Sequence, residues 1–482
     1  MSFACVVILI FANNVSSQSE PPLPSGLNEE ATPDTGEPVL VLPMGLEDES
    51  EPEEPVLPEG LGLEPQGKSE TKNEQGESVL QLPFDFSGLW EARVGGRLQD
   101  DPHEKDLSIG ETRFQMQLEK TVEQVAFKLT TDFLLDPVMD RYEIRLEEGK
   151  GIVDIREINL LFRPNDYIDV KTGRQTMTWG TGDLIFINDL FPKDWNSFFI
   201  GRDPEYLKAP SDSVKVSFFS GLGNLDIIYT PRFDADRFID GSRISFFNSG
   251  LGRRSGRDAI VITNERDKWF EDIETAWRLY KNLNGYELGV YGYRGFWKSP
   301  AGEDPLSGNS TFPVLSVYGG SIRGSAGKGI GNLELGYYNS EDDKNGGDSS
   351  VRNSEFRFLA GYEQEAARDF IVGIQYYLEH IIHYSNYRNS LPSGSPAADE
   401  NRHVLTLRLT KLLLGQNLML SLFTFYSPSD NDAYLRPKIS YKVDDHWSVE
   451  SGGNLFMGKD DHTFFGQFEK NNNLYIGVRY GF

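Results

Sequence analysis

The stretch NNNLYIGVRYGF, residues 471–482, alternates apolar and more polar positions up to its last residue. One face carries Leu474, Ile476, Val478, Tyr480 and Phe482, and the other carries Asn473, Tyr475, Gly477, Arg479 and Gly481. A period of two is that of a β-strand with one apolar face and one wetter face. Because the ends of soluble domains are usually loose and polar, this pattern predicts a final strand that is paired inside a sheet.

The composition of the 482-residue chain suits strands that are apolar on one side only. Hydrophobic residues make up 38%, yet Phe (31), Tyr (21) and Gly (48) are plentiful. The sequence contains no apolar run of the roughly 18 residues that a transmembrane helix needs. A helical membrane protein is therefore not expected.

Segments of about ten residues with a period of two continue from residue 84 to the end, which is typical of a transmembrane barrel. We expect strands at 84–95, 111–121, 124–135, 151–162, 166–178, 213–220, 224–232, 271–281, 285–297, 312–324, 329–340, 353–365, 369–382, 402–413, 417–427, 433–443, 446–457 and 471–482. The predicted fold is all-β: an up-and-down antiparallel barrel of about eighteen strands, with sixteen as the alternative.

The connections between these segments alternate in length. Short ones such as 163–166, 221–224 and 443–446 follow even-numbered strands, and long polar ones such as 179–212 and 233–270 follow odd-numbered strands. Outer-membrane barrels have this asymmetry, with short turns in the periplasm and long loops outside. An open edge would leave backbone groups unsatisfied in lipid, so the last strand is expected to pair with the first.

The part of the chain before residue 84 has a different character. Residues 1–17 hold a short apolar stretch followed by small residues, as in a cleaved signal peptide. Residues 18–83 hold sixteen acidic and two basic residues of a chain whose net charge is −27, and they repeat an E-P-V-L pattern. This Pro/Glu-rich composition predicts a disordered periplasmic leader. The repeat is either low-complexity drift or a set of motifs that add a strand to a partner.

The final strand ending in Phe482 resembles the assembly signal of bacterial outer-membrane barrels of Gram-negative cells, and the likeness covers 84–482 as architecture. It implies a porin-like protein of the outer membrane that contacts lipid, lipopolysaccharide and the barrel-assembly machinery. A second likeness rests on GRQTMTWGTGDLIF (173–186) and a hairpin closing on YTPRF (229–233). This element is similar to porin-like barrels encoded beside RND-type exporters, and more distantly to alginate-export-like barrels. It implies a periplasmic or inner-membrane exporter as a possible partner.

Side chains at alternate positions of a strand share one face, which we call their parity. If the apolar parity faces lipid, the other parity lines the lumen. The predicted lumen-lining basic residues are Arg93, Arg113, Lys171, Arg357, Arg408, Arg436, Lys438, Lys442 and Arg479. Acidic residues such as Glu91, Asp132, Glu363 and Glu379 share that parity. The set is either a mutually neutralising network that braces the wall or a basic ladder opposite an acidic arc that orients a solute.

The connection 179–212 is too apolar for an ordinary external loop. We expect it to fold back into the lumen, with Pro192 and Asp194 opening a short helical turn, and we add Asp183, Asp189, Asp194 and Trp195 to the candidate constriction. It could equally be a plug packed for stability. The arginines of the connection 233–269, among them Arg237, Arg243, Arg253 and Arg254, are expected to contact lipopolysaccharide.

The sequence offers no convergent nucleophile and base, no phosphate-binding loop and no metal-ligand spacing, and its acidic charge argues against nucleic-acid binding. The predicted function is passive or facilitated passage of a solute, possibly as the outer-membrane part of an export system. The alternative is a plugged barrel that acts through its leader and loops. We predict no enzymatic activity and no cofactor.

Overall fold

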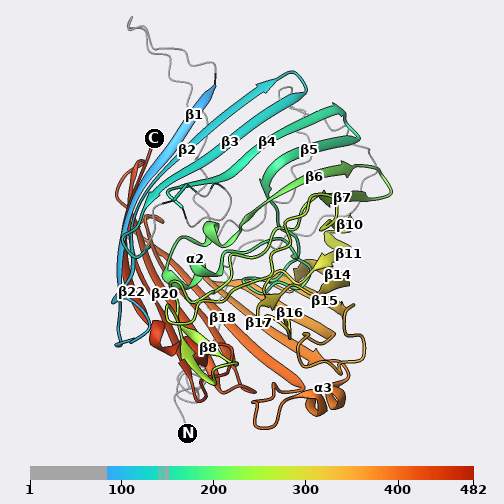
Figure 1. Ribbon diagram of the computed structural model, residues 1–482. Helices are drawn as coiled ribbons and strands as arrows, with labels where there is room; N and C mark the ends of the chain where they lie inside the picture. Colours follow the sequence, from blue (N-terminus) through green and yellow to red (C-terminus); the bar gives the residue numbers. More distant parts are fainter. Residues whose placement is uncertain (1–83, 140–142, 145, 147–150) are drawn as a thin grey trace, which may run out of the picture. The chain divides into compact units, whose positions relative to one another are not determined.

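A computed structural model of the chain describes residues 84–139, 143–144, 146 and 151–482. The predicted signal peptide and leader lie outside these residues. The described part contains an 18-stranded antiparallel sheet in which each strand pairs with its neighbours along the chain. Figure 1 shows the strands following one another around a barrel.

The eighteen barrel strands agree with the predicted segments, with shifts of a few residues at their ends. They are β1 (Asp85–Arg97), β2 (Leu107–Val122), β3 (Val125–Leu135), β4 (Val153–Asn165), β5 (Ile168–Thr176), β6 (Pro210–Phe218), β7 (Asn224–Thr230), β10 (Glu274–Leu283), β11 (Tyr286–Phe296), β14 (Val314–Ala326), β15 (Gly329–Ser340), β16 (Glu355–Ala367), β17 (Phe370–Ile381), β18 (Asn401–Leu413), β19 (Leu418–Ser427), β20 (Asp432–Lys442), β21 (Trp447–Gly458) and β22 (Asn473–Gly481). The count of eighteen is confirmed.

The barrel is closed by the pairing of β1 with β22. Trp90 lies opposite Tyr480 and Ala92 lies opposite Val478, in an antiparallel register that runs from Leu89 to Arg97. Closure gives every strand two neighbours, as a membrane-spanning sheet requires. The expectation drawn from the terminal stretch is confirmed.

The alternation of apolar residues sets which face of each strand points outward. Large apolar side chains of the predicted outward parity are exposed in strand after strand, including Phe114, Leu160, Ile227, Leu288, Leu335, Ile374, Leu405, Ile439, Leu474 and Ile476. Their neighbours of the other parity, such as Tyr434 and Tyr475, are buried. The strands therefore carry an apolar outer face around a more polar interior.

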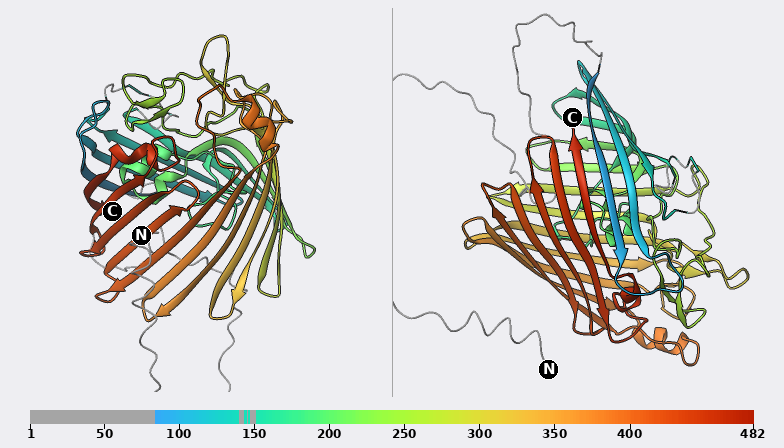
Figure 2. Two further views of the ribbon diagram at one scale, coloured as in Figure 1. Left: turned by 90° about the horizontal axis from the view of Figure 1, so that it is seen from below. Right: turned by 90° about the vertical axis from the view of Figure 1, so that its left-hand side faces the viewer.

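The connections keep the predicted alternation of short and long, with the expected exception of the short connection 428–431 between β19 and β20. Two short sheets lie in the long ones: β8 (Phe246–Asn248) pairs with β9 (Arg253–Ser255), and β12 (Gly302–Glu303) pairs with β13 (Ser310–Thr311). Figure 2 shows the long connections gathered at one end of the barrel, where helix α3 (Tyr384–Ser390) projects. In the part of the chain that is described, none of the helices has the length and apolar content to cross a bilayer.

Candidate functional site in the barrel lumen

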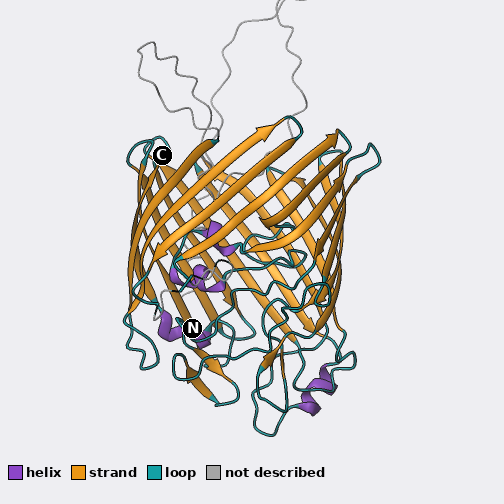
Figure 3. Ribbon diagram, turned by 45° about the horizontal axis from the view of Figure 1, so that its top comes forward, coloured by secondary structure: helices purple, strands orange, loops and turns teal. Residues whose placement is uncertain are grey.

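The connection between β5 and β6, residues 177–209, lies inside the ring of strands (Figure 3). It contains helix α2 (Trp195–Ile200) and the 3-10 helix η1 (Pro204–Leu207). The Asp194 carboxylate caps α2 by accepting from the Ser197 amide at 2.7 Å, and Gly201 ends the helix with φ of 91°. We call residues 177–209 the inserted loop. Its bounds are narrower than the predicted 179–212 at the second end, because β6 already begins at Pro210.

Aromatic side chains of α2 pack on the inner wall. The Phe198 ring lies 5.8 Å from that of Tyr434 on β20, and the Phe199 ring lies 5.2 Å from that of Phe456 on β21. Tyr434 and Phe456 stack on each other at 4.4 Å. All four side chains are buried. The apolar character that argued against an external loop is therefore explained by burial against the wall.

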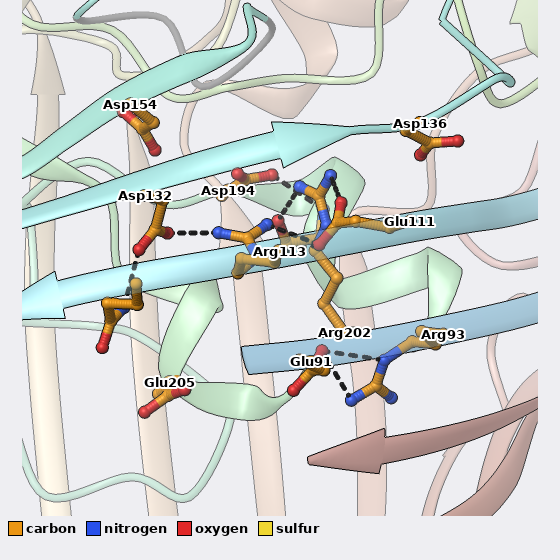
Figure 4. A network of polar contacts seen from close by, with 12 residues as sticks. Glu91, Arg93, Glu111, Arg113, Asp132, Asp136, Asp154, Asp194, Arg202 and Glu205 are labelled. Carbon is orange, nitrogen blue, oxygen red and sulfur yellow. Dashed lines mark hydrogen bonds and ion pairs between the residues drawn. The ribbon is translucent and has the colours of Figure 1, made fainter. Parts of the chain in front are cut away.

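A network of buried ion pairs fixes the inserted loop to β2 and β3 (Figure 4). Arg202 of the loop pairs with Glu111, and Glu111 also pairs with Arg113 at 2.8 Å. Arg113 reaches on to Asp132. Because an unpaired buried charge is costly, loss of any member would leave a neighbouring charge less well compensated.

Tyr206 of η1 is held between two cations of the wall. The guanidinium carbon of Arg113 lies 4.0 Å from the centroid of its ring, and that of Arg156 lies 4.7 Å away. Arg156 also donates to the carbonyl oxygens of Glu205 and Lys208 at 3.2 and 3.0 Å. The second half of the inserted loop is therefore clamped on β2 and β4.

A second set of charges joins the loop to β1, β20 and β22. Arg479 pairs with Glu91 at 2.7 Å and with Glu205 at 3.2 Å, while Lys438 pairs with Glu450 at 2.7 Å and with Asp203 at 3.5 Å. Burial alone would raise the pKa of Asp203, but Lys438 and Arg479 outweigh it and hold that pKa at about 2. Asp203 is therefore an anion at neutral pH.

Arg93 adds a contact from the first strand. It pairs with Glu91 at 3.1 Å and also with Glu450, and its guanidinium donates to the Gly201 carbonyl of the inserted loop. This part of the lumen is thus filled by compensated charges.

The first half of the inserted loop contacts the opposite arc of the wall. The Glu334 carboxylate of β15 accepts from the Thr181 and Asn188 amides at 2.9 and 2.8 Å. Asp183 pairs with Arg408 of β18 at 3.0 Å, and Arg408 also pairs with Glu363. The loop therefore crosses the lumen from β2 to β15 and β18.

Asp183 stands among cations. Burial raises the pKa of Asp183, and the charges of Arg408, Arg323 and Arg436 act in the opposite direction. The Arg436 guanidinium carbon lies 4.1 Å from the centroid of the Phe198 ring. Asp183 also exchanges two hydrogen bonds with the Gln375 side chain of β17, at 2.7 and 2.8 Å, so this stretch of the loop is fixed to the wall as well.

A cavity of about 590 Å³ adjoins the inserted loop on the side of the long connections. Its lining comes from the loop, from the connections 231–273, 297–313 and 459–472, and from the inner wall near Tyr338 and Arg357. A site of this volume is within the range of small-molecule pockets.

The structure brings most of the predicted site residues together around the inserted loop. Contacts with the loop are made by Arg93, Arg113, Arg408, Arg436, Lys438 and Arg479. Asp183, Asp189, Asp194 and Trp195 belong to the loop itself, and Arg357 lines the cavity. Lys171 and Lys442 lie apart, pairing with Glu157 at 3.8 Å and Asp445 at 3.1 Å.

Sequence reasoning missed several anchors of the loop, chiefly Glu111, Arg156, Arg202, Asp203 and Tyr206. The sequence did contain one pattern that could have pointed to the charged anchors on the wall. A Glu-x-Arg pattern occurs in three strands, at 91–93, 111–113 and 355–357, and its two charges share one face of the strand. A repeated pair of this kind on the lumen parity marks compensated charge on the wall.

Two arginines predicted for external contacts turn inward to acidic partners. Arg237 pairs with Asp154 at 2.8 Å and with Asp194 of the inserted loop at 3.5 Å, and Arg243 pairs with Asp136. Arg253 and Arg254 pair with Asp258 at 2.9 Å and Asp461 at 2.8 Å. Contact with lipopolysaccharide stays a prediction, and Arg253, which is half exposed, is the member of this set placed to make it.

No protein-family model matches the chain, and no curated protein matches it. Solved structures do. OccAB1 of Acinetobacter baumannii aligns with a TM-score of 0.50 at 9% identity, covering 83% of this chain and 96% of that chain. Residues 84–482 have the fold of bacterial outer-membrane porin barrels.

Further similar structures have lower scores. OccD3 (OpdP) of Pseudomonas aeruginosa has a TM-score of 0.48 at 10% identity over 82% of this chain and 91% of that chain. The outer membrane channel DcaP of Acinetobacter baumannii has 0.40 at 11% identity over 83% and 97%. At these identities the likeness concerns the fold alone. The likeness to barrels encoded beside exporters stays a prediction.

Proposed function

We propose that residues 84–482 form an outer-membrane channel for the passive or facilitated passage of a solute, with the inserted loop as its constriction. The observation that carries this proposal is the uneven filling of the lumen. Ion pairs fix the loop to β2, β18, β20 and β22, whereas a cavity of about 590 Å³ lies open beside it. Barrels of 16–18 strands leave an aqueous channel unless something fills them.

The narrow zone would lie where Asp183 faces Arg408, Arg323 and Arg436. Fixed charges beside a narrow path sort ions and polar solutes by sign. Arg408 is already compensated by Asp183 and Glu363, so the zone combines a modest net charge with strong local dipoles. This geometry supports passage of small polar or amphiphilic solutes.

A plugged barrel is the alternative, and the buried ion pairs favour it to the extent that they immobilise the loop. In that case residues 177–209 would serve stability, and the long connections or the part of the chain before residue 84 would carry the function.

The partner assignments follow from the architecture. We propose that the barrel-assembly machinery recognises β22, since this strand forms the closing seam with β1, and that outer-membrane lipid covers the apolar outer face. A periplasmic or inner-membrane exporter as partner rests on the motif likeness in 173–186 alone.

Single-channel conductance of the purified protein in a planar bilayer tests the proposal. The comparison is with a variant in which Gly182–Gly201 is replaced by a short glycine linker. A matched control removes Asn386–Ala397 from the connection that carries α3, whose helix has no buried residue.

Steady conductance in the intact protein, larger after the Gly182–Gly201 replacement and unchanged in the control, would support a constricted channel. An intact protein that is silent and conducts only after the replacement would identify a plug. Silence of all three would contradict passage through the barrel.

A further inference from the structure

The cavity beside the inserted loop exposes apolar surface inside an otherwise polar lumen. Its half-buried lining residues include Leu184, Ile185, Phe186, Leu190, Trp195 and Phe238. Apolar surface left in contact with water costs roughly 25 cal/mol per Å². A concave arrangement of such side chains is typical of a ligand site.

The charged groups of the loop at this cavity are satisfied by the protein itself. The Lys193 ammonium pairs with Asp189 at 2.8 Å and donates to the Phe191 carbonyl at 2.8 Å. Lys298 on the facing connection pairs with Glu274 at 2.5 Å. A ligand therefore meets no uncompensated ammonium group in this part of the lining.

The arginines of the wall are compensated in the same way. Three cations face three anions: Arg352 and Arg357 pair with Glu355 at 2.6 and 2.7 Å, both lie within 3.6 Å of Glu379, and Arg402 pairs with Asp430 at 2.8 Å. The three guanidinium groups lie over the rings of Trp297, Tyr338 and Phe464. This cluster has no net charge to offer an ionic ligand.

Trp195 lines the cavity, and its one polar side-chain atom is already bonded to the protein. The indole nitrogen donates to Asp236 at 3.0 Å, and the same carboxylate accepts from the Ser299 hydroxyl at 2.6 Å and from the Lys193 amide at 2.8 Å. The Phe186 ring lies 6.2 Å from that of Trp195 in an edge-to-face arrangement. The two rings form a pre-built aromatic wall.

We propose that this cavity binds an uncharged aromatic solute. The volume fits one or two rings, and the rings of Phe186 and Trp195 supply stacking partners. The cations of the lining are paired with carboxylates, and the Asp236 carboxylate is already bonded to three neutral donors. A carboxylate ligand would lose its hydration without gaining a free cation, and an ammonium ligand would meet only a carboxylate, Asp236, that is already bonded to three donors. The inference assigns a solute class to the proposed channel. Only the role of the cavity as a step in transport rests on the proposed function, since binding alone requires no passage.

Equilibrium dialysis of the full-length protein in lipid nanodiscs, against empty nanodiscs, measures this binding. The probes are indole and indole-3-carboxylate, which share a ring system and differ in charge. We expect indole to bind at least tenfold more tightly. Absence of saturable indole binding, or equal affinity for the two probes, would overturn the proposal.

Variants locate the site. Ile185→Arg introduces an uncompensated cation into the lining, so indole affinity should fall at least tenfold while that for indole-3-carboxylate falls less or rises. Phe464 lies at the rim of the cavity and is 45% exposed. Phe464→Ala should weaken indole binding about threefold, and it serves as the test if Ile185→Arg does not fold. Leu306→Arg is the matched control, because Leu306 is 96% exposed on the connection 297–313.

Indole binding that is unchanged in both cavity variants would place the site elsewhere and overturn the proposal. Conductance separates this result from the proposed function. If the protein binds indole in the cavity but does not conduct in the bilayer, the result supports the binding site and contradicts the proposed channel. If the protein conducts but does not bind indole, the result supports the proposed channel and contradicts the binding site.

Discussion

The guanidinium of Arg113 on β2 lies against the ring of Tyr206 in the inserted loop, with 4.0 Å between its central carbon and the ring centroid. Both side chains are buried. The contact joins the barrel wall to the segment that crosses the lumen, so the loop is held by packing as well as by ion pairs. Whatever passes the barrel passes a fixed obstacle on this side.

Replacing Tyr206 separates the ring from the hydroxyl group. Tyr206→Ala removes the ring from between Arg113 and Arg156 and leaves a buried void, which should lower the free energy of unfolding by about 3–5 kcal/mol. In the described residues the Tyr206 hydroxyl has no hydrogen-bond partner, so Tyr206→Phe should change it by less than about 1 kcal/mol. Denaturant unfolding followed by tryptophan fluorescence measures both. Equal losses in the two variants would contradict the clamp.

Acid should weaken the anchorage at Asp203. Its pKa of about 2 lies below the ordinary value of 3.8, so its contribution is present above about pH 4 and is lost as the pH falls toward 2. Asp203→Asn should therefore cost about 2 kcal/mol of unfolding free energy at pH 7, and almost nothing at pH 2. Thermal or denaturant unfolding of both proteins from pH 2 to 7 checks this. Asp445→Asn is the control, because the Asp445 side chain is 93% exposed. Its unfolding free energy should differ from that of the unchanged protein by about the same small amount at every pH.

The strand pattern predicted the fold because a closed up-and-down barrel imposes it. Each strand must alternate and each connection must return the chain, so the period of two and the alternating gaps both appear in the sequence. The face of Arg436 or Lys438 then follows from parity, and the apolar content of 177–209 predicts its burial. Local pattern is enough for these features.

The pairing of charges across the lumen was not predictable in the same way. Arg479 and Glu91, or Arg202 and Glu111, lie far apart in the chain and meet only through the closure of the barrel and the path of the loop. Parity says that a side chain faces inward but not which opposite charge it meets. The inward orientation of Arg237 and Arg243 was missed because the sequence of a long connection does not distinguish arginines that contact lipid from arginines that pair with buried aspartates.

The contact between the connections 98–106 and 231–273 should respond to pH in the neutral range. The Glu104 side chain is buried, and its Oε2 accepts from Arg257 at 3.1 Å. Burial raises the pKa of Glu104 to about 7, with Arg97 and Arg257 opposing. A carboxyl whose folded pKa is raised from 4.5 stabilises the folded form fully below pH 4.5, and this contribution is lost as the pH rises through 7.

Hydrogen exchange of these two connections should accordingly show at least tenfold less protection at pH 8 than at pH 5, after correction for the intrinsic rates. The linked free energy is about 3 kcal/mol. Glu104→Gln should abolish the difference. It also separates Glu104 from the neighbouring pair of His103 and Asp258, whose atoms lie 3.0 Å apart, because that pair is retained in the variant. A pH response that persists in Glu104→Gln would show that Glu104 does not carry the effect.

If the proposed channel narrows beside Asp183, charge there should set its ion preference. Asp183 lies among Arg408, Arg323 and Arg436, so Asp183→Asn should shift the permeability ratio toward anions by about twofold to threefold, and Arg436→Gln should shift it toward cations. Reversal potentials in a KCl gradient measure both. Lys442→Gln is the matched control, since Lys442 lies half exposed at the short-turn end beside Asp445.

The shifts should shrink as salt rises, because the screening length falls from about 10 Å at 0.1 M to about 3 Å at 1 M. If Lys442→Gln moved the ratio as much as Arg436→Gln, selectivity would reside at the short-turn mouth instead of beside the inserted loop. If neither Asp183→Asn nor Arg436→Gln moved it, the ion path would avoid Asp183 altogether. The constriction would then have to lie between other parts of the wall.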